Sequence, residues 1–184
     1  MKALITGASS GIGRDMARVL AEKGWDLILV ARREDRLFAL KKEFAGVHVR
    51  CIGEDISTKE GCMRLYNNTK DEKIDMLINN AGFGVCGTFL KNDLDEELRM
   101  IHTNVIAVHI LTKLFVRDFE KRGSGILLNT ASFAGFMAGP MLTGYYATKS
   151  YVVRLTQALY EELRQTGSNV RVSVLCPGPV KTEF

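Results

Sequence analysis

Residues 6–13, TGASSGIG, join an apolar run at residues 3–6 to a segment in which Ile12, Met16 and Leu20 recur at helical spacing. Glycines lack a Cβ, so they allow a tight turn and a close approach of the backbone to a ligand. The free N–H groups and the dipole of the following helix favour an anion. The stretch therefore predicts the first strand–turn–helix unit of a dinucleotide-binding fold, with a purely structural turn as the alternative.

Strand-like runs alternate with helical patterns along the whole chain. Several runs are apolar without a break, as is typical of strands buried on both faces of a parallel sheet. The alternation predicts right-handed crossovers and one doubly wound, Rossmann-type α/β domain over residues 1–184. The six expected strands are residues 3–6, 26–31, 47–52, 76–79, 126–130 and 170–176. The longest helical stripe contains Leu94, Leu98, Ile101, Val105 and Val108.

Composition narrows the function classes. The chain has 184 residues, 46% of them hydrophobic, and a net charge of +4, which is too small to argue for nucleic acid. No apolar run reaches the length of a membrane span and no signal peptide is recognisable, so we expect a cytoplasmic protein without a membrane partner. We expect no metal site and reduced, mostly buried thiols, because the four cysteines lack ligand spacing: Cys51, Cys62, Cys86 and Cys176.

The stretch YYATK, residues 145–149, offers an acid/base pair. Residues four apart share one face of a helix, so Tyr145 meets Lys149 while Tyr146 points elsewhere. A phenol has a reference pKa of about 10, and a nearby ammonium lowers that pKa toward a value useful near neutral pH. Tyr145 is therefore the catalytic candidate. A surface Tyr–Lys pair would be the preferred interpretation if this pattern stood alone.

Four further polar positions follow strands or interrupt apolar runs. NNAG, residues 79–82, ends the fourth strand at the carboxyl edge of the predicted sheet, where ligands bind. Asn104 lies among apolar residues and belongs to either a structural network or a site. Ser132 follows the fifth strand, where serine is often only a cap. Asp55 follows the third strand and is a candidate N-cap for a helix that starts near Ser57.

The order and spacing of these motifs resemble the compact branch of the short-chain dehydrogenase/reductase family. The match comprises T-G-x-x-x-G-x-G, NNAG, Asn104, Ser132, Y-x-x-x-K and PGPVKT at residues 177–182. The resemblance implies that Tyr145 exchanges the substrate proton and that Ser132 holds the substrate oxygen. It implies that Lys149 and Asn104 support a proton relay, with the helix kinked at Asn104, and that Asp55 accepts from adenine.

The resemblance also implies a nicotinamide dinucleotide along the carboxyl edge of the sheet. Ala31 stands where relatives that prefer NAD carry an acidic residue, and Arg32 and Arg33 follow it, so we expect NADP. The expected cofactor contacts are Gly7, Ser9, Ser10, Gly11, Ile12, Gly13, Arg32, Arg33, Asp55, Ile56, Asn80, Ala81, Gly82, Tyr145, Lys149, Pro177, Gly178, Val180 and Thr182.

The sequence thus predicts an NADP-dependent oxidoreductase that interconverts a carbonyl and a secondary alcohol on a small-molecule substrate. A 3-oxoacyl reductase of fatty-acid synthesis, a non-catalytic NADP-sensing module and a sugar-nucleotide epimerase are the alternatives. The intact catalytic set disfavours the sensor, and the glycine spacing and chain length disfavour the epimerase. Phe83, Val85, Phe133, Phe136 and Met141 are equally candidates for an apolar pocket and for core packing.

Relatives continue beyond the PGPVKT motif into a substrate-covering segment and a seventh strand. We therefore expect a longer natural chain that forms a dimer or a tetramer.

Overall fold

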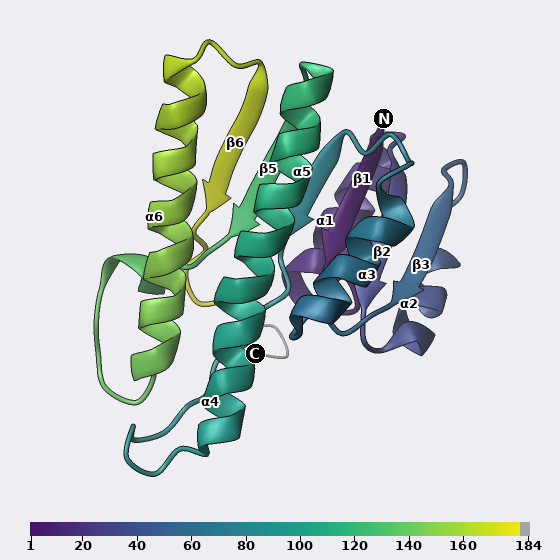
Figure 1. Ribbon diagram of the computed structural model, residues 1–184. Coiled ribbons are helices and arrows are strands. Elements are labelled where there is room, and N and C mark those ends of the chain that lie inside the picture. The colour runs from purple at the N-terminus through teal and green to yellow at the C-terminus, as the bar shows by residue number, and fades with distance from the viewer. Residues whose placement is uncertain (181–184) are drawn as a thin grey trace.

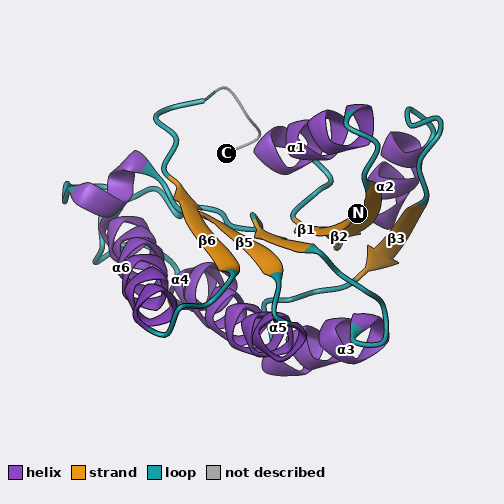
Figure 2. Ribbon diagram, turned by 90° about the horizontal axis from the view of Figure 1, so that it is seen from above, coloured by secondary structure: helices purple, strands orange, loops and turns teal. Residues whose placement is uncertain are grey.

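The computed structural model describes residues 1–180, which form a parallel sheet with helices on both faces (Figures 1 and 2). The strand order is β3-β2-β1-β4-β5-β6 and every neighbouring pair is parallel. This confirms the doubly wound α/β fold. The strands are β1 (Lys2–Thr6), β2 (Asp26–Ala31), β3 (Val49–Gly53), β4 (Met76–Asn79), β5 (Gly125–Thr130) and β6 (Val170–Leu175).

The helices divide between the two faces of the sheet. Figure 2 shows α1 and α2 on one face and α3, α5 and α6 on the other. The helices are α1 (Gly11–Glu22), α2 (Glu34–Lys41), α3 (Lys59–Thr69), α4 (Leu94–Ile101), the π-helix η1 (His102–Ala107), α5 (Val108–Arg122), the 3₁₀-helix η2 (Phe133–Phe136) and α6 (Thr143–Gln165).

Alternate side chains of each central strand serve two separate cores. In β1, Ala3 and Ile5 pack toward α1 and α2, whereas Leu4 packs among side chains of α3 and α5. All three side chains are completely buried. Burying one such leucine or isoleucine stabilises the fold by roughly 1.5–3 kcal/mol. The unbroken apolar runs of the sequence reflect this two-sided burial.

The long stripe expected from Leu94 to Val108 is only partly a core face. Val108 is buried, but Leu94 and Leu98 are 66% and 44% exposed. Figure 1 shows the reason, since α4 extends past the ends of the strands and has no sheet beneath its first turns. Periodicity predicted the helix but could not reveal how far it projects.

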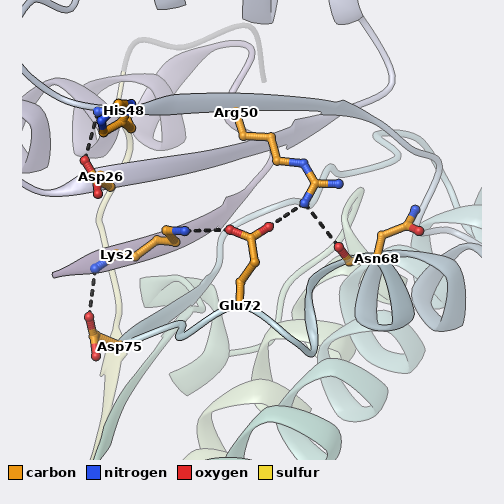
Figure 3. Close-up of polar contacts among 7 residues, drawn as sticks. All are labelled: Lys2, Asp26, His48, Arg50, Asn68, Glu72 and Asp75. Carbon is orange, nitrogen blue, oxygen red and sulfur yellow. Dashed lines mark hydrogen bonds and ion pairs between the residues drawn. The ribbon is translucent and has the colours of Figure 1, made fainter.

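Charged side chains cluster at the amino ends of the strands (Figure 3). Glu72 accepts from Lys2 Nζ at 2.6 Å and also from Arg50, while the Lys2 N–H donates to Asp75 Oδ2 at 2.9 Å. Arg50 additionally donates to the carbonyl of Asn68 at 3.1 Å. Burial acts to raise the pKa of Glu72, but the two cationic partners outweigh it and lower the pKa. These contacts tie β1 and β3 to the end of α3.

The thiols are free among residues 1–180, and those residues contain no cluster suited to a metal ion. Burial raises the pKa of Cys62 to about 12. Cys62 is buried, Cys51 and Cys176 are half-buried and Cys86 is exposed, so the expectation of mostly buried thiols was wrong. Within the same residues, none of the helices is both long and apolar enough to cross a membrane.

The sheet order reverses direction at β1, which pairs with β2 on one side and with β4 on the other. The chain leaves β1 toward one face and β4 toward the other, so the loops after these two strands separate. A crevice opens at such a point, at the carboxyl ends of the strands. This crevice is where the sequence motifs converge.

Candidate active site

A cavity of about 830 Å³ follows the carboxyl ends of the strands. It is lined by every residue expected to contact the cofactor except Gly13 and Thr182. Thr182 lies outside the described residues. Gly13 is buried, and a Cβ there would collide with Asn80 and Gly7, so this glycine serves close packing beneath the loop. The other residues predicted from the sequence to contact the cofactor therefore all lie around one continuous cavity.

The glycine loop is held by the NNAG motif across the switch point. Gly7 has φ +68°, and a Cβ on it would lie 2.7 Å from the Cα of Ala81. The Asn80 side chain donates to the carbonyl of Thr6 at 3.2 Å and to that of Gly7 at 3.4 Å. The Thr6 hydroxyl in turn accepts from the N–H groups of Asn80 and Ala81, at 3.0 and 3.1 Å. The glycine motif includes Thr6, but the sequence alone does not reveal this role of its hydroxyl.

An exposed, cationic end of the cavity surrounds the start of α1. Ser10 is the N-cap of α1, but its side chain makes no capping hydrogen bond. Arg33 lies over this loop and donates to Ser9 Oγ at 3.4 Å and to Ser10 Oγ at 3.3 Å. Ser9, Ser10, Arg32 and Arg33 together form what we call the phosphate end. Arg33, rather than Arg32, is the arginine that reaches the glycine loop.

Asp55 does not cap a helix. Thr58 is the N-cap of α3 and accepts from the Gly61 N–H at 3.0 Å, so the N-cap alternative for Asp55 was wrong. Asp55 Oδ1 accepts instead from the Ser57 N–H at 2.9 Å. Burial acts to raise the pKa of Asp55, but hydrogen bonds from Ser57 and the charges of Arg32 and Arg99 lower it overall. Asp55 therefore presents an ionised carboxylate to the cavity.

At the opposite end, Ser132, Tyr145 and Lys149 converge, and we call this group the proton-transfer end. Burial raises the pKa of Tyr145, and a hydrogen bond with the Ser132 side chain partly offsets the increase. The Ser132 hydroxyl also accepts from the Ala134 N–H at 3.1 Å and so caps η2. The cap and site interpretations of Ser132 are compatible.

Lys149 lies beneath Tyr145 on the same face of α6, as the four-residue spacing predicted. Its Nζ is 5.7 Å from the centroid of the phenol ring and donates to the carbonyl of Thr130 at 3.0 Å. Lys149 is 5% exposed, and burial lowers its pKa to about 8. The expected lowering of the Tyr145 pKa by Lys149 was wrong: burial raises this pKa, and Ser132 rather than Lys149 partly offsets the increase.

Asn104 lies in η1, where the helix widens to π geometry. Its side chain exchanges two hydrogen bonds with the backbone of Phe83: Nδ2 donates to the carbonyl at 2.8 Å and Oδ1 accepts from the N–H at 3.1 Å. Nδ2 also donates to Thr148 Oγ1 at 3.1 Å. π-helical turns inside α-helices occur frequently at functional sites. The irregularity expected at Asn104 is thus a π-helix, and the amide connects three segments.

The cavity fits a dinucleotide. The phosphate end offers an uncapped helix start, hydroxyl groups and guanidinium groups, which suit an anion. Along the cavity wall, Thr130 Oγ1 is buried and has no hydrogen-bond partner among the described residues. An unpartnered buried hydroxyl costs free energy unless a ligand or water supplies the bond. No sequence motif points to the hydroxyl of Thr130. Further lining residues that the sequence analysis does not single out include Thr103, Ala134, Met137 and Leu142. Tyr146 also lines the cavity, so the expectation that it points elsewhere was wrong.

The sequence profile described as short chain dehydrogenase matches residues 1–184. The chain belongs to the short-chain dehydrogenase/reductase family. This short-chain dehydrogenase is therefore an oxidoreductase of a family that binds nucleotide cofactors. It is 36% identical over 183 residues to an uncharacterized oxidoreductase of Staphylococcus saprophyticus. The aligned region covers 98% of this chain and 74% of the relative. It is equally 36% identical to the ketoacyl reductase HetN of Nostoc, over 96% of this chain but only 62% of HetN.

Solved structures of similar enzymes superpose closely on this short-chain dehydrogenase. One from Sphingobium yanoikuyae in complex with NADPH has a TM-score of 0.92 and 34% identity, covering 99% of this chain and 72% of that one. One from Burkholderia phymatum in complex with NAD has a TM-score of 0.91 and 32% identity, covering 98% and 66%. Overall similarity therefore leaves the choice between the two cofactors to local residues.

Proposed function

We propose that this short-chain dehydrogenase is an NADP(H)-dependent oxidoreductase that interconverts a carbonyl and a secondary alcohol. The observation that carries the proposal is the proton-transfer end, where a buried phenol meets the Ser132 hydroxyl above a buried lysine. The same cavity continues to the glycine loop and to Arg33. A reaction centre and an anion site thus share one cavity.

When bound, the nicotinamide cofactor supplies or accepts the hydride. The glycine loop and the start of α1 would hold its pyrophosphate, and Asp55 with Ile56 would border the adenine. Lys149 and Asn80–Gly82 would border the nicotinamide ribose. The protein contributes position and electrostatics to this chemistry.

Tyr145 is the proton donor and acceptor in this proposal. Its raised pKa keeps the phenol protonated at neutral pH, so the hydroxyl can donate to the oxygen of a carbonyl that is being reduced. Ser132, whose hydroxyl reaches the same phenol, holds that oxygen in place. Lys149 and Asn104 support resupply of the proton from behind Tyr145.

The preference for NADP rests on the end of β2. Ala31 cannot accept a hydrogen bond from a ribose 2′-hydroxyl and brings no charge that would repel a 2′-phosphate. Arg32 and Arg33 line the cavity beside it. A guanidinium offers a planar fork of donors that suits phosphate oxygens. One similar solved structure contains NADPH and another contains NAD, so the proposed preference for NADP depends on these residues and not on overall similarity.

The test is a panel of ketones and aldehydes incubated with NADPH and, separately, with NADH, followed at the absorbance band of the reduced nicotinamide. We expect turnover of at least one ketone, with a lower KM for NADPH than for NADH. Tight binding of NADPH without turnover of any carbonyl would favour the NADP-sensing module instead.

Reduction of a 3-oxoacyl thioester is the narrower candidate. It is favoured by the relatives, since HetN is named a ketoacyl reductase and a rat relative, 32% identical over 172 residues, is a very-long-chain 3-oxoacyl-CoA reductase. The chain spans 55% of the rat protein. Adding a 3-oxoacyl-CoA and the matching simple ketone to the panel decides between the two: the thioester should show the higher kcat/KM if this candidate is right.

A further inference from the structure

The cavity beyond Tyr145 has walls of uncharged, mainly apolar side chains. Phe83 comes from the loop after β4, Phe133 and Met137 from η2 and its end, and Leu142 and Tyr146 from the start of α6. We infer that the substrate is a neutral carbonyl compound whose substituents next to the carbonyl are apolar. This inference rests on the proposed function and names the substrate class of the same site.

These walls are fixed to one another by hydrogen bonds. The Gly87 N–H donates to the carbonyl of Met141 at 2.7 Å, which joins the loop after β4 to the loop before α6. The Ser150 hydroxyl donates to the carbonyl of Gly135 at 3.0 Å, which fixes η2 on α6. A Cβ on Gly135 would lie 2.7 Å from Val153, so η2 lies as close to α6 as a glycine permits. The apolar walls are therefore preformed.

The charged lining residues lie elsewhere, with one exception. Arg32, Arg33, Glu54 and Asp55 follow β2 and β3, and three strand spacings, roughly 14 Å, separate β2 from β5. The exception is Lys149, which is buried and already donates to Thr130. A carboxylate or phosphate beside the carbonyl would therefore lose hydration and find no ion partner among the described lining residues other than Lys149. Burial of an unpaired charge is costly, so such substrates should bind poorly.

The first experiment compares ketones of equal length that end either in a methyl group or in a carboxylate, with NADPH as cofactor. We expect the methyl compound to show a kcat/KM higher by roughly 10- to 100-fold, chiefly through KM. Equal or better use of the carboxylate would overturn the inference while leaving the proposed function intact. Turnover of neither compound, nor of any other ketone with NADPH or NADH, would instead reject the proposed function.

Introducing a positive charge into the apolar wall tests the wall itself. Met137→Arg places a cation on the lining and should raise kcat/KM for the carboxylate compound by roughly 10-fold, because the new guanidinium supplies the missing partner. Phe136→Arg is the matched control, since Phe136 is the adjacent residue and is 53% exposed against 46% for Met137, but does not line the cavity. Thermal unfolding checks that both variants fold, and Met137→Lys serves as a second cation. Equal effects of Phe136→Arg and Met137→Arg would contradict the inference.

Thr148 joins the start of α6 to η1 through two hydrogen bonds, and these contacts point to a role in positioning Tyr145. The hydroxyl donates to the carbonyl of Tyr145 at 2.8 Å and accepts from Asn104 Nδ2 at 3.1 Å. Thr148 is buried and does not line the cavity. The Asn104 amide, as described above, also clamps the backbone of Phe83. One hydroxyl therefore connects the backbone of Tyr145 to the amide that fixes the cavity wall.

We propose that Thr148 is a positioning residue, which sets the first turn of α6 relative to η1 and so places the Tyr145 hydroxyl. Loss of the Thr148 hydroxyl removes one partner of Asn104 and one hydrogen bond to the Tyr145 backbone. Displacements of about 1 Å at a reacting group can cost roughly 100-fold in rate. The effect should therefore appear in kcat rather than in cofactor binding.

The same helix contains a matched control. Thr156 lies eight residues later on the same face of α6, is buried, donates to the carbonyl of Val152 at 2.6 Å and accepts from Asn129 Nδ2 at 2.9 Å. It repeats the hydrogen bonding of Thr148 but is bonded to β5 instead of η1, and it does not line the cavity. A merely structural role would make the two threonines equivalent.

The experiment compares Thr148→Val, Thr156→Val and Thr148→Ser. Thr148→Val should lower kcat by roughly 10- to 100-fold and shift the pH profile of kcat, with the Kd for NADPH, measured by fluorescence, unchanged. Thr148→Ser should restore both, because it keeps the hydroxyl, and Thr156→Val should lower the melting temperature without moving the pH profile. Thr148→Val and Thr156→Val with the same kcat and pH profile would overturn the proposal.

Discussion

Both ends of the cavity contain hydroxyl and cationic groups, but the phosphate end is exposed to solvent and the proton-transfer end is buried. At the phosphate end, Arg32 and Arg33 are exposed, so water and salt screen their charges. At the proton-transfer end, Tyr145 and Lys149 are 9% and 5% exposed, and burial changes the pKa of each. The exposed end can therefore select a ligand by a modest free-energy difference, whereas the buried end can alter the chemistry of its own groups. The predictions below test this contrast, beginning with the largest effect.

Tyr145→Phe removes from the buried end only the oxygen that we propose transfers the proton. We expect kcat to fall by at least about 1,000-fold, within the range typical of general acid–base catalysis, while the Kd for NADPH stays nearly constant. Tyr146→Phe, a change of the same size at the neighbouring residue, should remain active. Steady-state kinetics and fluorescence titration measure the two quantities. Similar behaviour of the two variants would show that the roles of the two phenols are wrongly assigned.

Lys149→Met should inactivate the enzyme and yet stabilise the fold. A lysine pKa lowered from 10.5 to about 8 corresponds to roughly 3 kcal/mol of destabilisation while the lysine is charged in the folded state. Since the folded pKa is the lower one, this cost is complete below pH 8, shrinks as the pH rises, and is gone above about 10.5. Denaturant unfolding of the protein without cofactor should thus show a stability gain at pH 7 that disappears at high pH. Equal stability of both proteins at pH 7 would show that the burial of Lys149 carries no cost.

Ala31→Asp combined with Arg32→Ala should reverse the preference from NADPH to NADH. Each charge-assisted hydrogen bond lost from the phosphate is worth about 1.5–3 kcal/mol. Arg33→Ala alone should also weaken NADPH binding, because Arg33 is the arginine that reaches Ser9 and Ser10. The ratio of kcat/KM values for the two cofactors measures both effects. Equal efficiency with NADPH and NADH in the unaltered enzyme would refute the role given to these residues.

The smallest predicted effect is that of salt, which should act on the phosphate end of the cavity but not on the proton-transfer end. Raising the ionic strength from about 0.05 to about 0.5 M should narrow the NADPH preference by a few-fold, because exposed charges are screened over a shorter distance. The apparent pKa values of the kcat profile, which belong to buried groups, should stay in place. A salt-independent cofactor preference would indicate that solvent does not screen the phosphate end as its exposure suggests.

The sequence predicted the parts of the site that depend on spacing and order. Glycines 7 and 11 and the Tyr145–Lys149 pair fall where the motifs placed them, because local backbone rules decide such positions. Arg33, rather than Arg32, reaches the glycine loop, since one residue at a strand end changes the direction of the side chain. The raised pKa of Tyr145 was also beyond reach, because burial is a property of the assembled fold.

Contacts between distant segments were the least predictable part. Thr130 and Thr148 have no periodic or motif signal of their own, and the motif that contains Thr6 does not reveal what its hydroxyl bonds, yet each has a buried hydroxyl at or beside the site. Their roles come from neighbours that only the folded chain brings near. The seventh strand, the substrate-covering segment, the cytoplasmic location and the oligomer stay predictions.

The dependence of the glycine loop on the NNAG motif also bears on the order in which the protein is made. The loop is synthesised before the groups that hold it, because Asn80 and Ala81 follow it by more than seventy residues. A nascent chain that ends after β3 has the residues proposed to bind phosphate without the contacts that shape the loop. Cofactor binding during synthesis must therefore wait until β4 has taken its place beside β1.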